Sequence, residues 1–296
     1  MKKSTSYKVF TVFNTIFMCL LGVVMIYPYL NQLAIAFNES ADTALGGIYL
    51  LPRKLTFQNF GTILTNPRVG TAAVVSVLKT VINTALALLV TFSAAYALSR
   101  KNLKGRAIIT KLYAVTMYLS AGVVPTYILY RHLGLINNFW VYILPYTFSF
   151  YNMVIMRSFI QQLPASLEEA ALIDGANELT IMMKVVIPLS KPVLATVALW
   201  VAVGQWNEYT TTLYYITDRT LYSLQYLMMS ILKQNETLRQ AALDAAMGAS
   251  EKTTQQPASE SIKAAMMIVT TVPIICLYPF LQKYFVKGVT LGAVKE

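Results

Sequence analysis

Six long apolar runs constrain the fold of this chain more than any other feature of its sequence. They cover about residues 9–29, 74–97, 108–129, 139–156, 183–213 and 262–285. A run of about 20 apolar residues can cross roughly 30 Å of hydrocarbon, where a helix satisfies its own backbone hydrogen bonds. Only 12% of the residues are charged, against roughly one quarter in soluble domains. We therefore predict an all-α, polytopic membrane protein whose six spans form one domain over residues 1–296.

The first run has a second interpretation, as a secretory signal peptide. Three lysines, Lys2, Lys3 and Lys8, precede it, and Ala34-Ile35-Ala36 could serve as a cleavage site. The apolar core of a signal peptide is about 7 to 15 residues long, whereas this run has about 20. We expect it to stay attached as the first span.

The lysines and arginines beside the runs predict the orientation. The connection "SRKNLKGR" at residues 99–106 carries four basic residues and no acid, and each end of the chain adds three lysines. A six-span path puts these segments on one side, which the positive-inside rule makes cytoplasmic, so both termini are expected there. The net charge of +11 thus follows from topology, and anionic membrane lipid, not nucleic acid, is the partner that it implies.

One inward-facing connection contains "SLEEAALIDGA" at residues 166–176, with three carboxylates in a chain that has few acids. Ser166 and Glu169 have capping-box spacing, which predicts a short helix that begins at Leu167 and ends at Gly175. Three- and four-residue spacing puts four side chains on one face, namely Leu167, Ala170, Ala171 and Asp174. Small residues there would let another protein come close. The alternative is a helix at the lipid headgroups, anchored by Leu167, Leu172 and Ile173.

The longer segment "EAALIDGANELTIMMKVVIPLSKP" at residues 169–192 resembles the EAA loop of permease subunits in binding-protein-dependent ABC importers. The matching positions are Glu169, Ala170, Ala171, Asp174, Gly175, Ala176, Pro188 and Pro192. Apolar exchanges at Met182, Val185 and Ile187 depart from the pattern. "LGLINN", "QWNEY" and "QKYFVKGVTLGAVKE" resemble the maltose-type sugar permeases, and the tail also resembles permeases for complex plant-polysaccharide oligosaccharides.

This resemblance implies a six-helix ABC importer permease in a bacterial plasma membrane, with a coupling helix at about residues 167–176 that docks on a cytoplasmic ATPase. The implied coupling residues are Leu167, Glu169, Ala170, Ala171, Asp174, Gly175 and Ala176, with Gly288 and Gly292 in a tail that contacts the ATPase. The implied partners are a second permease in a heterodimer, two ATPase subunits, an extracellular or periplasmic solute-binding protein and a carbohydrate.

The chain itself is not expected to be an enzyme. None of its 13 glycines is followed by lysine, so the phosphate-binding motif G-x-x-x-x-G-K-[ST] is missing from the sequence. We expect no cofactor or metal on this chain, and we expect ATP and Mg²⁺ on the separate ATPase.

Two other functions compete with ATP-driven import. An ion-coupled secondary transporter usually has several ionisable groups near the bilayer midplane. This chain has one acid inside a span, Glu208, and two lysines near span ends, Lys79 and Lys111, which could snorkel to the interface. A membrane scaffold or sensor without transport is the second alternative, and it leaves the polar span residues unexplained.

Several span residues could line a sugar path, because sugars stack on aromatic rings and accept or donate hydrogen bonds. They are Asn83, Tyr151, Asn152, Trp206, Asn207 and Glu208. For Asn83 and Asn152 the alternative is an interhelical hydrogen bond, typically worth about 0.6 kcal/mol. Trp206 and Glu208 lie about 200° apart around a helix, so one of them is expected to face a helix interface instead.

Overall fold

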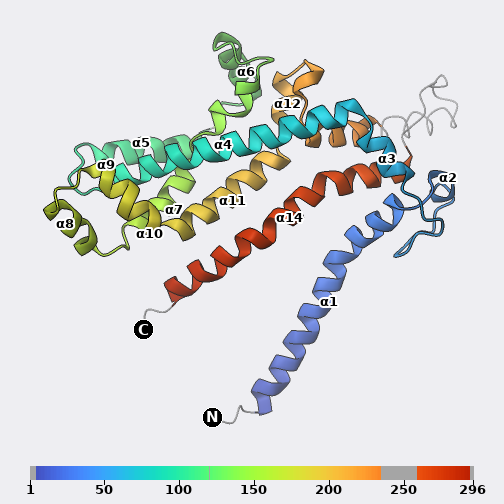
Figure 1. The fold of residues 1–296 in the computed structure, drawn as a ribbon, viewed down its shortest axis with the longest axis horizontal. Coiled ribbons are helices and arrows are strands. Elements are labelled where there is room, and N and C mark those ends of the chain that lie inside the picture. Colours follow the sequence, from blue (N-terminus) through green and yellow to red (C-terminus); the bar gives the residue numbers. More distant parts are fainter. Residues whose placement is uncertain (1–4, 120, 235–258, 294–296) are drawn as a thin grey trace. The chain divides into compact units, whose positions relative to one another are not determined.

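The computed structural model describes residues 5–119, 121–234 and 259–293, with side chains from residue 7 to residue 276 within those ranges. The regular structure of these residues is helical (Figure 1), which confirms the all-α prediction. The chain divides into two compact units, Met1–Gly70 with Met228–Val272, and Thr71–Leu227 with Pro273–Glu296.

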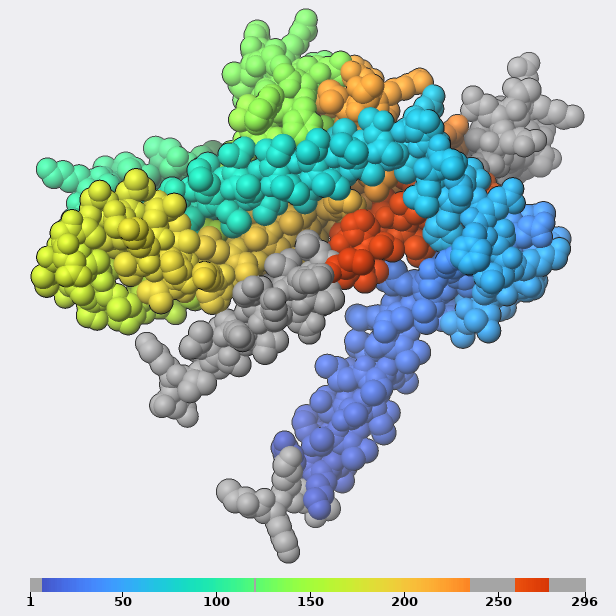
Figure 2. Space-filling model, in the orientation of Figure 1, coloured from blue at the N-terminus to red at the C-terminus, as the bar shows by residue number. Residues whose placement is uncertain are grey.

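The first unit contains one long, bare helix, α1 (Thr5–Ala36), followed by two short ones, α2 (Ser40–Thr43) and α3 (Gln58–Leu64). No part of the most apolar window of α1 is buried within the chain. Most of its side chains lie at the surface in Figure 2, coloured blue, whereas Ala34 and Ala36 at its C-terminal end are buried. Since an apolar helix surface is unfavourable in water, lipid or another subunit must cover α1.

A buried polar cluster holds the segment after α1 to the start of α14 (Glu260–Ala293). The side chain of Asn38 donates to Asp42 Oδ2 at 2.9 Å and to Thr43 Oγ1 at 3.0 Å, and Ser261 donates to the same threonine oxygen at 2.7 Å. The Asn38 amide and the Arg53 guanidinium hold the pKa of Asp42 below its usual value. These bonds satisfy polar groups that would otherwise be costly to bury.

The second unit is built from α4 and the helices that follow it. Their bounds are α4 Pro67–Ser99, α5 Arg106–Tyr118, α6 Val123–His132, η1 Phe139–Tyr142, η2 Leu144–Tyr146, α7 Phe150–Ile160, α8 Ala165–Ile173, α9 Glu178–Ile181, η3 Met182–Val186, α10 Ile187–Leu189, α11 Lys191–Asn207, α12 Thr210–Tyr215 and η4 Arg219–Leu221. A further helix is described over 224–234, and the division between the two units falls within it, after Leu227.

Two apolar cores stabilise this unit. The larger joins α4, α7, α9, η3 and α11 through eleven buried residues, Phe92, Ala95, Tyr96, Leu98, Met153, Met156, Ile160, Ile181, Val186, Val193 and Val197. The smaller surrounds η1 and the end of α12, and includes Val75, Tyr142 and Tyr215. The larger core therefore joins the segment around α8 directly to α4 and α11.

Three of the expected spans are interrupted. The run at 108–129 is not one helix, because α5 ends at Tyr118 and α6 begins at Val123. Gly122 precedes α6 with φ +80°, a conformation that glycine adopts at little cost. Two bent helix pairs, Phe139–Tyr146 with Phe150–Ile160 and Glu178–Leu189 with Lys191–Asn207, turn by 46° and 80°.

The 80° bend lies at Ser190, between two prolines of the sequence motif. Pro188 and Pro192 lie in the first turns of α10 and α11, where the N–H group that proline lacks has no partner within the helix, so both fit the helix starts beside the bend. The π-helix Met182–Val186 lies just before it, a further departure from regular α-helix. In the described residues, Tyr7–Ala36 and Pro67–Ser99 are each long and apolar enough to span a membrane, and each bent pair could add one broken span. The count of six spans stays a prediction.

Candidate functional site

The helix α8 is the exposed centre of the sequence motif. Figure 2 shows this segment at the surface, in yellow-green, and none of its residues is buried. Ile173 is 86% exposed, and Leu167 and Leu172 are also exposed. Such a surface on a nine-residue helix is suited to contact with another molecule, because so short a helix is not stable by itself.

The C-terminal end of α8 has a closed geometry. Gly175 has φ +80°, its N–H donates to Leu172 O at 3.0 Å, and the N–H of Ala176 donates to Ala171 O at 2.9 Å. These two bonds are the 5→2 and 6→1 pair of a Schellman motif. The expectation that Gly175 ends the helix in the left-handed conformation is confirmed.

The N-terminal end of α8 differs from the prediction. The helix begins at Ala165, two residues before the expected start, and its N-cap is Pro164, with no side-chain hydrogen bond at the cap. Ser166 therefore lies inside the first turn, where its hydroxyl cannot act as the N-cap acceptor. The capping box proposed for Ser166 and Glu169 is wrong, because the φ of −60° and ψ of 126° at Pro164 already start the helix there.

The face proposed for docking is only partly free. Leu167, Ala170 and Asp174 are exposed, whereas Ala171 and Ala176 are half-buried against the larger core of the same unit. Glu169 is exposed at the surface. The face that another protein can reach thus excludes Ala171.

Arg100, the residue after α4, is the basic centre that holds the motif in place. Its guanidinium pairs with Glu168 in α8, with Glu178 at the start of α9 at 2.8 Å, and with the hydroxyl of Tyr96. Burial by itself would lower the pKa of Arg100, but the Tyr96 hydrogen bond and the Glu168 charge raise it above its usual value. One cation therefore connects the end of α4 to both sides of the loop that contains Gly175.

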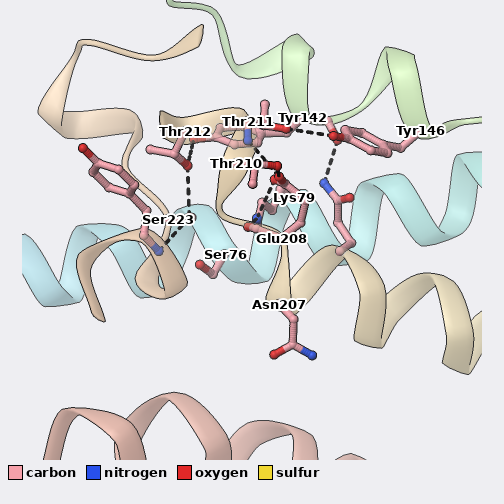
Figure 3. A network of polar contacts seen from close by, with 12 residues as sticks. Ser76, Lys79, Tyr142, Tyr146, Asn207, Glu208, Thr210, Thr211, Thr212 and Ser223 are labelled. Atoms are coloured by element: carbon pink, nitrogen blue, oxygen red, sulfur yellow. Dashed lines mark hydrogen bonds and ion pairs between the residues drawn. The ribbon is translucent and has the colours of Figure 1, made fainter. Parts of the chain in front are cut away.

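A second polar cluster lies in the same unit, around the end of α11 (Figure 3). Lys79 of α4 is completely buried, and its ammonium donates to the backbone oxygen of Glu208 at 2.6 Å. It lies 3.9 Å from Glu208 Oε2 and 5.1 Å from the centre of the Tyr142 ring. The other oxygen, Glu208 Oε1, accepts the N–H of Thr211 at 2.7 Å in the first turn of α12.

Hydroxyl groups extend this cluster into the neighbouring segments. The Tyr142 hydroxyl contacts Thr212 Oγ1 at 2.7 Å and donates to Leu221 O at 2.8 Å. Gln205 donates to Tyr142 O at 2.7 Å, and Ser76 accepts the N–H of Leu224 at 2.8 Å. The buried lysine is therefore the centre of a network that fixes η1, α11 and α12 against α4.

The structure contradicts the prediction made for Lys79 and gives Arg100 a role that the sequence did not predict. The expectation that Lys79 snorkels to the interface is wrong, because its side chain has 0% exposure and a carboxylate partner. Sequence reasoning also counted Arg100 only as an orientation charge. The partners of Lys79 and Arg100 lie far from them along the chain, and Glu208 comes 129 positions after Lys79. No local sequence pattern predicts such a pair.

The structure does not bring the six proposed path residues together. Trp206 lines a hollow of about 470 Å³ with Thr80 and Thr84. Glu208 belongs to the Lys79 cluster, and Asn207 points away from that cluster (Figure 3) and donates to Val203 O. The separation expected between Trp206 and Glu208 is thus found.

The other three candidates have different surroundings. Asn83 is buried, and within the described residues its Oδ1 has no hydrogen-bond partner. Tyr151 is exposed beside the Trp200 ring, 6.3 Å between centres. Asn152 is half-buried in the first turn of α7. The tail glycines Gly288 and Gly292 lie in α14, whose backbone continues to Ala293.

Comparison with known proteins gives one family. The family model for "Binding-protein-dependent transport system inner membrane component" matches residues 87–291. Protein LplC of Bacillus subtilis (strain 168) is 36% identical, covering 100% of this chain and 98% of the relative. The polygalacturonan/rhamnogalacturonan transport system permease protein YtcP of the same organism is 33% identical, covering 94% of this chain and 96% of the relative.

A solved structure agrees with these sequences. It is the crystal structure of a bacterial ABC transporter involved in the import of the acidic polysaccharide alginate. The similarity has a TM-score of 0.84 and 29% identity, and covers 96% of this chain and 99% of the solved chain. Sequence and fold therefore point to the same class of membrane protein.

Proposed function

Since this chain belongs to the family of binding-protein-dependent transport system inner membrane components, we propose that it forms half of the translocation path of an ATP-driven oligosaccharide importer. The observation that carries this proposal is α8, a short exposed helix with a closed end that Arg100 ties to α4. A secondary transporter does not need such a helix. The named substrates of YtcP and of the alginate transporter support a carbohydrate cargo.

The proposed assembly contains this permease, a second permease, two cytoplasmic ATPase subunits and a solute-binding protein. ATP and Mg²⁺ would bind to the ATPase subunits, and this chain would supply no catalytic group. Both termini would lie in the cytoplasm. ATPase closure would move α8, and the two permeases would then rock around a central cavity. Trp206 would be a sugar contact, because it lines the mostly apolar hollow beside Thr80 and Thr84.

Purification of the whole complex tests this function. We expect an ATPase and a second permease to copurify with the chain, and ATP hydrolysis to rise when a sugar-loaded binding protein is added. Oligosaccharide uptake into proteoliposomes should require ATP on the side of the membrane where the ATPase subunits lie. Uptake that follows an imposed sodium or proton gradient without ATP would instead establish the secondary transporter.

Gly175→Val should impair coupling through the backbone. A residue with a Cβ atom pays about 1–2 kcal/mol to adopt the left-handed conformation. This cost lowers the equilibrium constant for the closed end of α8 by roughly 5- to 30-fold. Space is not the cause, since a Cβ at Gly175 would meet nothing within 4 Å. We expect sugar-stimulated ATP hydrolysis and uptake to fall while membrane insertion is unchanged. The matched variant Gly175→Asn should be milder, because asparagine tolerates this conformation; equal activity of both variants would contradict the prediction.

A bulky residue at Ala170 should block docking by its size. Ala170 is exposed on the proposed docking face, whereas Ala165 is exposed about 140° away around the helix. Ala170→Trp is therefore expected to reduce copurification of the ATPase, measured against total permease, and Ala165→Trp is its control. Equal recovery of the ATPase from both variants would show that this face is not the docking surface.

A further inference from the structure

A basic hollow lies beside α5, next to the Arg100 cluster, because Lys101 and Arg106 also line a neighbouring hollow with Arg100. Its volume is about 810 Å³, and four cations line it, Lys101, Arg106, Lys111 and Arg157. Apolar residues complete the lining, among them Leu103 and Ile108, and no acidic residue takes part. The hollow therefore combines positive charge with an apolar wall.

The cations of this hollow differ from Arg100, which has two carboxylate partners. Arg157 donates to Thr110 Oγ1 at 3.3 Å. Across the part of the chain that the structure describes, no ion pair to a carboxylate involves Arg106 or Arg157. Both guanidinium groups are on half-buried residues. Bringing such cations together without an anion is unfavourable, so the hollow has the electrostatics of an anion site.

The surface next to the hollow shows which anion fits. Along α5, Ile108 is 71% exposed, Leu112 63% and Val115 56%, so an uncovered apolar stripe runs along the same helix as Arg106 and Lys111. This combination of basic and apolar surface is typical of the level of lipid headgroups, and basic pockets between membrane helices bind anionic ones. A hydrated acidic protein surface would gain nothing from Leu103 and Ile108.

We propose that this hollow binds the phosphate of an anionic phospholipid, such as phosphatidylglycerol, with an acyl chain along α5. Arg106 and Arg157 bind the phosphate oxygens, since guanidinium groups match their geometry. Lys101 and Lys111 add charge around them. Such a lipid would fill the space between the α4–α5 connection and α7. This binding does not depend on which solute the complex transports.

Native mass spectrometry of the purified complex tests the site. The complex is titrated with dioleoyl-phosphatidylglycerol and, separately, with dioleoyl-phosphatidylcholine. Arg106→Gln and Arg157→Gln are each expected to weaken phosphatidylglycerol binding about fivefold and to leave phosphatidylcholine binding unchanged. The matched control is Lys104→Gln, which removes one charge from the same connection but does not line the hollow. Arg157→Lys keeps the charge without the guanidinium geometry, so its affinity should lie between those of Arg157→Gln and the unchanged complex, which separates lost charge from misfolding.

Three outcomes would overturn the site. Equal weakening by all three glutamine variants would mean diffuse attraction to the surface. Displacement of the lipid by millimolar inorganic phosphate would mean a free phosphate site. Unchanged lipid affinity together with loss of ATPase copurification from the Arg106 and Arg157 variants would mean that the hollow meets an acidic face of the ATPase.

Discussion

Replacing Arg100 with glutamine is expected to reduce the number of sugar molecules transported per ATP by roughly 5- to 150-fold. This is the factor that corresponds to typical coupling free energies between two sites, about 1–3 kcal/mol. The complex should still assemble and hydrolyse ATP, because the larger apolar core keeps α4 and the motif together. What is lost is the connection from Tyr96 and Arg100 to Glu168 and Glu178. Without it, α8 can move while α4 stays in place.

The ratio of sugar to ATP separates coupling from folding. A purely structural role would lower ATP hydrolysis and uptake together and leave their ratio unchanged, which would contradict the prediction. Lys104→Gln in the same connection is the control, since Lys104 has no part in these ion pairs. Exchanging the charges, with Arg100→Glu and Glu168→Arg together, should restore part of the ratio.

Removing one member of the buried pair between Lys79 and Glu208 should have the largest effect on stability. Breaking a buried ion pair costs about 3–5 kcal/mol, because the remaining charge has no compensation. Lys79→Met and Glu208→Gln should each sharply lower the yield of intact complex and its thermal midpoint. The double variant is expected to recover much of the loss, since no buried charge is left.

An exposed ion pair gives the control for this cycle. Lys54 pairs with Glu39 at 3.4 Å, and both side chains are about half exposed or more. Lys54→Met should cost about 1 kcal/mol or less. Additive losses of stability in the double variant of Lys79 and Glu208 would show that the two groups do not interact. A loss of stability from Lys54→Met as large as that from Lys79→Met would show that burial is not the cause.

The sequence predicted the kind of structure better than its interruptions. Apolar runs depend on composition alone, which is why the all-α class was predictable. A run such as 183–213 does not reveal an 80° bend, because the angle depends on how α9, η3 and α11 pack on α4. Pro188 and Pro192 were visible as motif positions, but proline permits a bend without setting its size.

The site was predictable where it depends on one residue's own geometry. Gly175 is such a position, since its conformation follows from the end of a short helix. Arg100 and Lys79 are not, because their partners are brought to them by tertiary packing. The capping box failed for a related reason: Pro164 competes with Ser166 for the start of α8, and spacing cannot tell which one wins.

The bend at Ser190 has a mechanical consequence, because it joins two helical segments at nearly a right angle. One segment, Glu178–Leu189, adjoins α8, and the other, Lys191–Asn207, ends beside Glu208. With 17 residues, α11 is about 25 Å long, so a rotation of about 10° at the corner displaces its far end by about 4 Å. At such a bend, a shift along the axis of Glu178–Leu189 becomes a sideways rotation of Lys191–Asn207. A small movement of α8 therefore produces its largest displacement at the far end of α11.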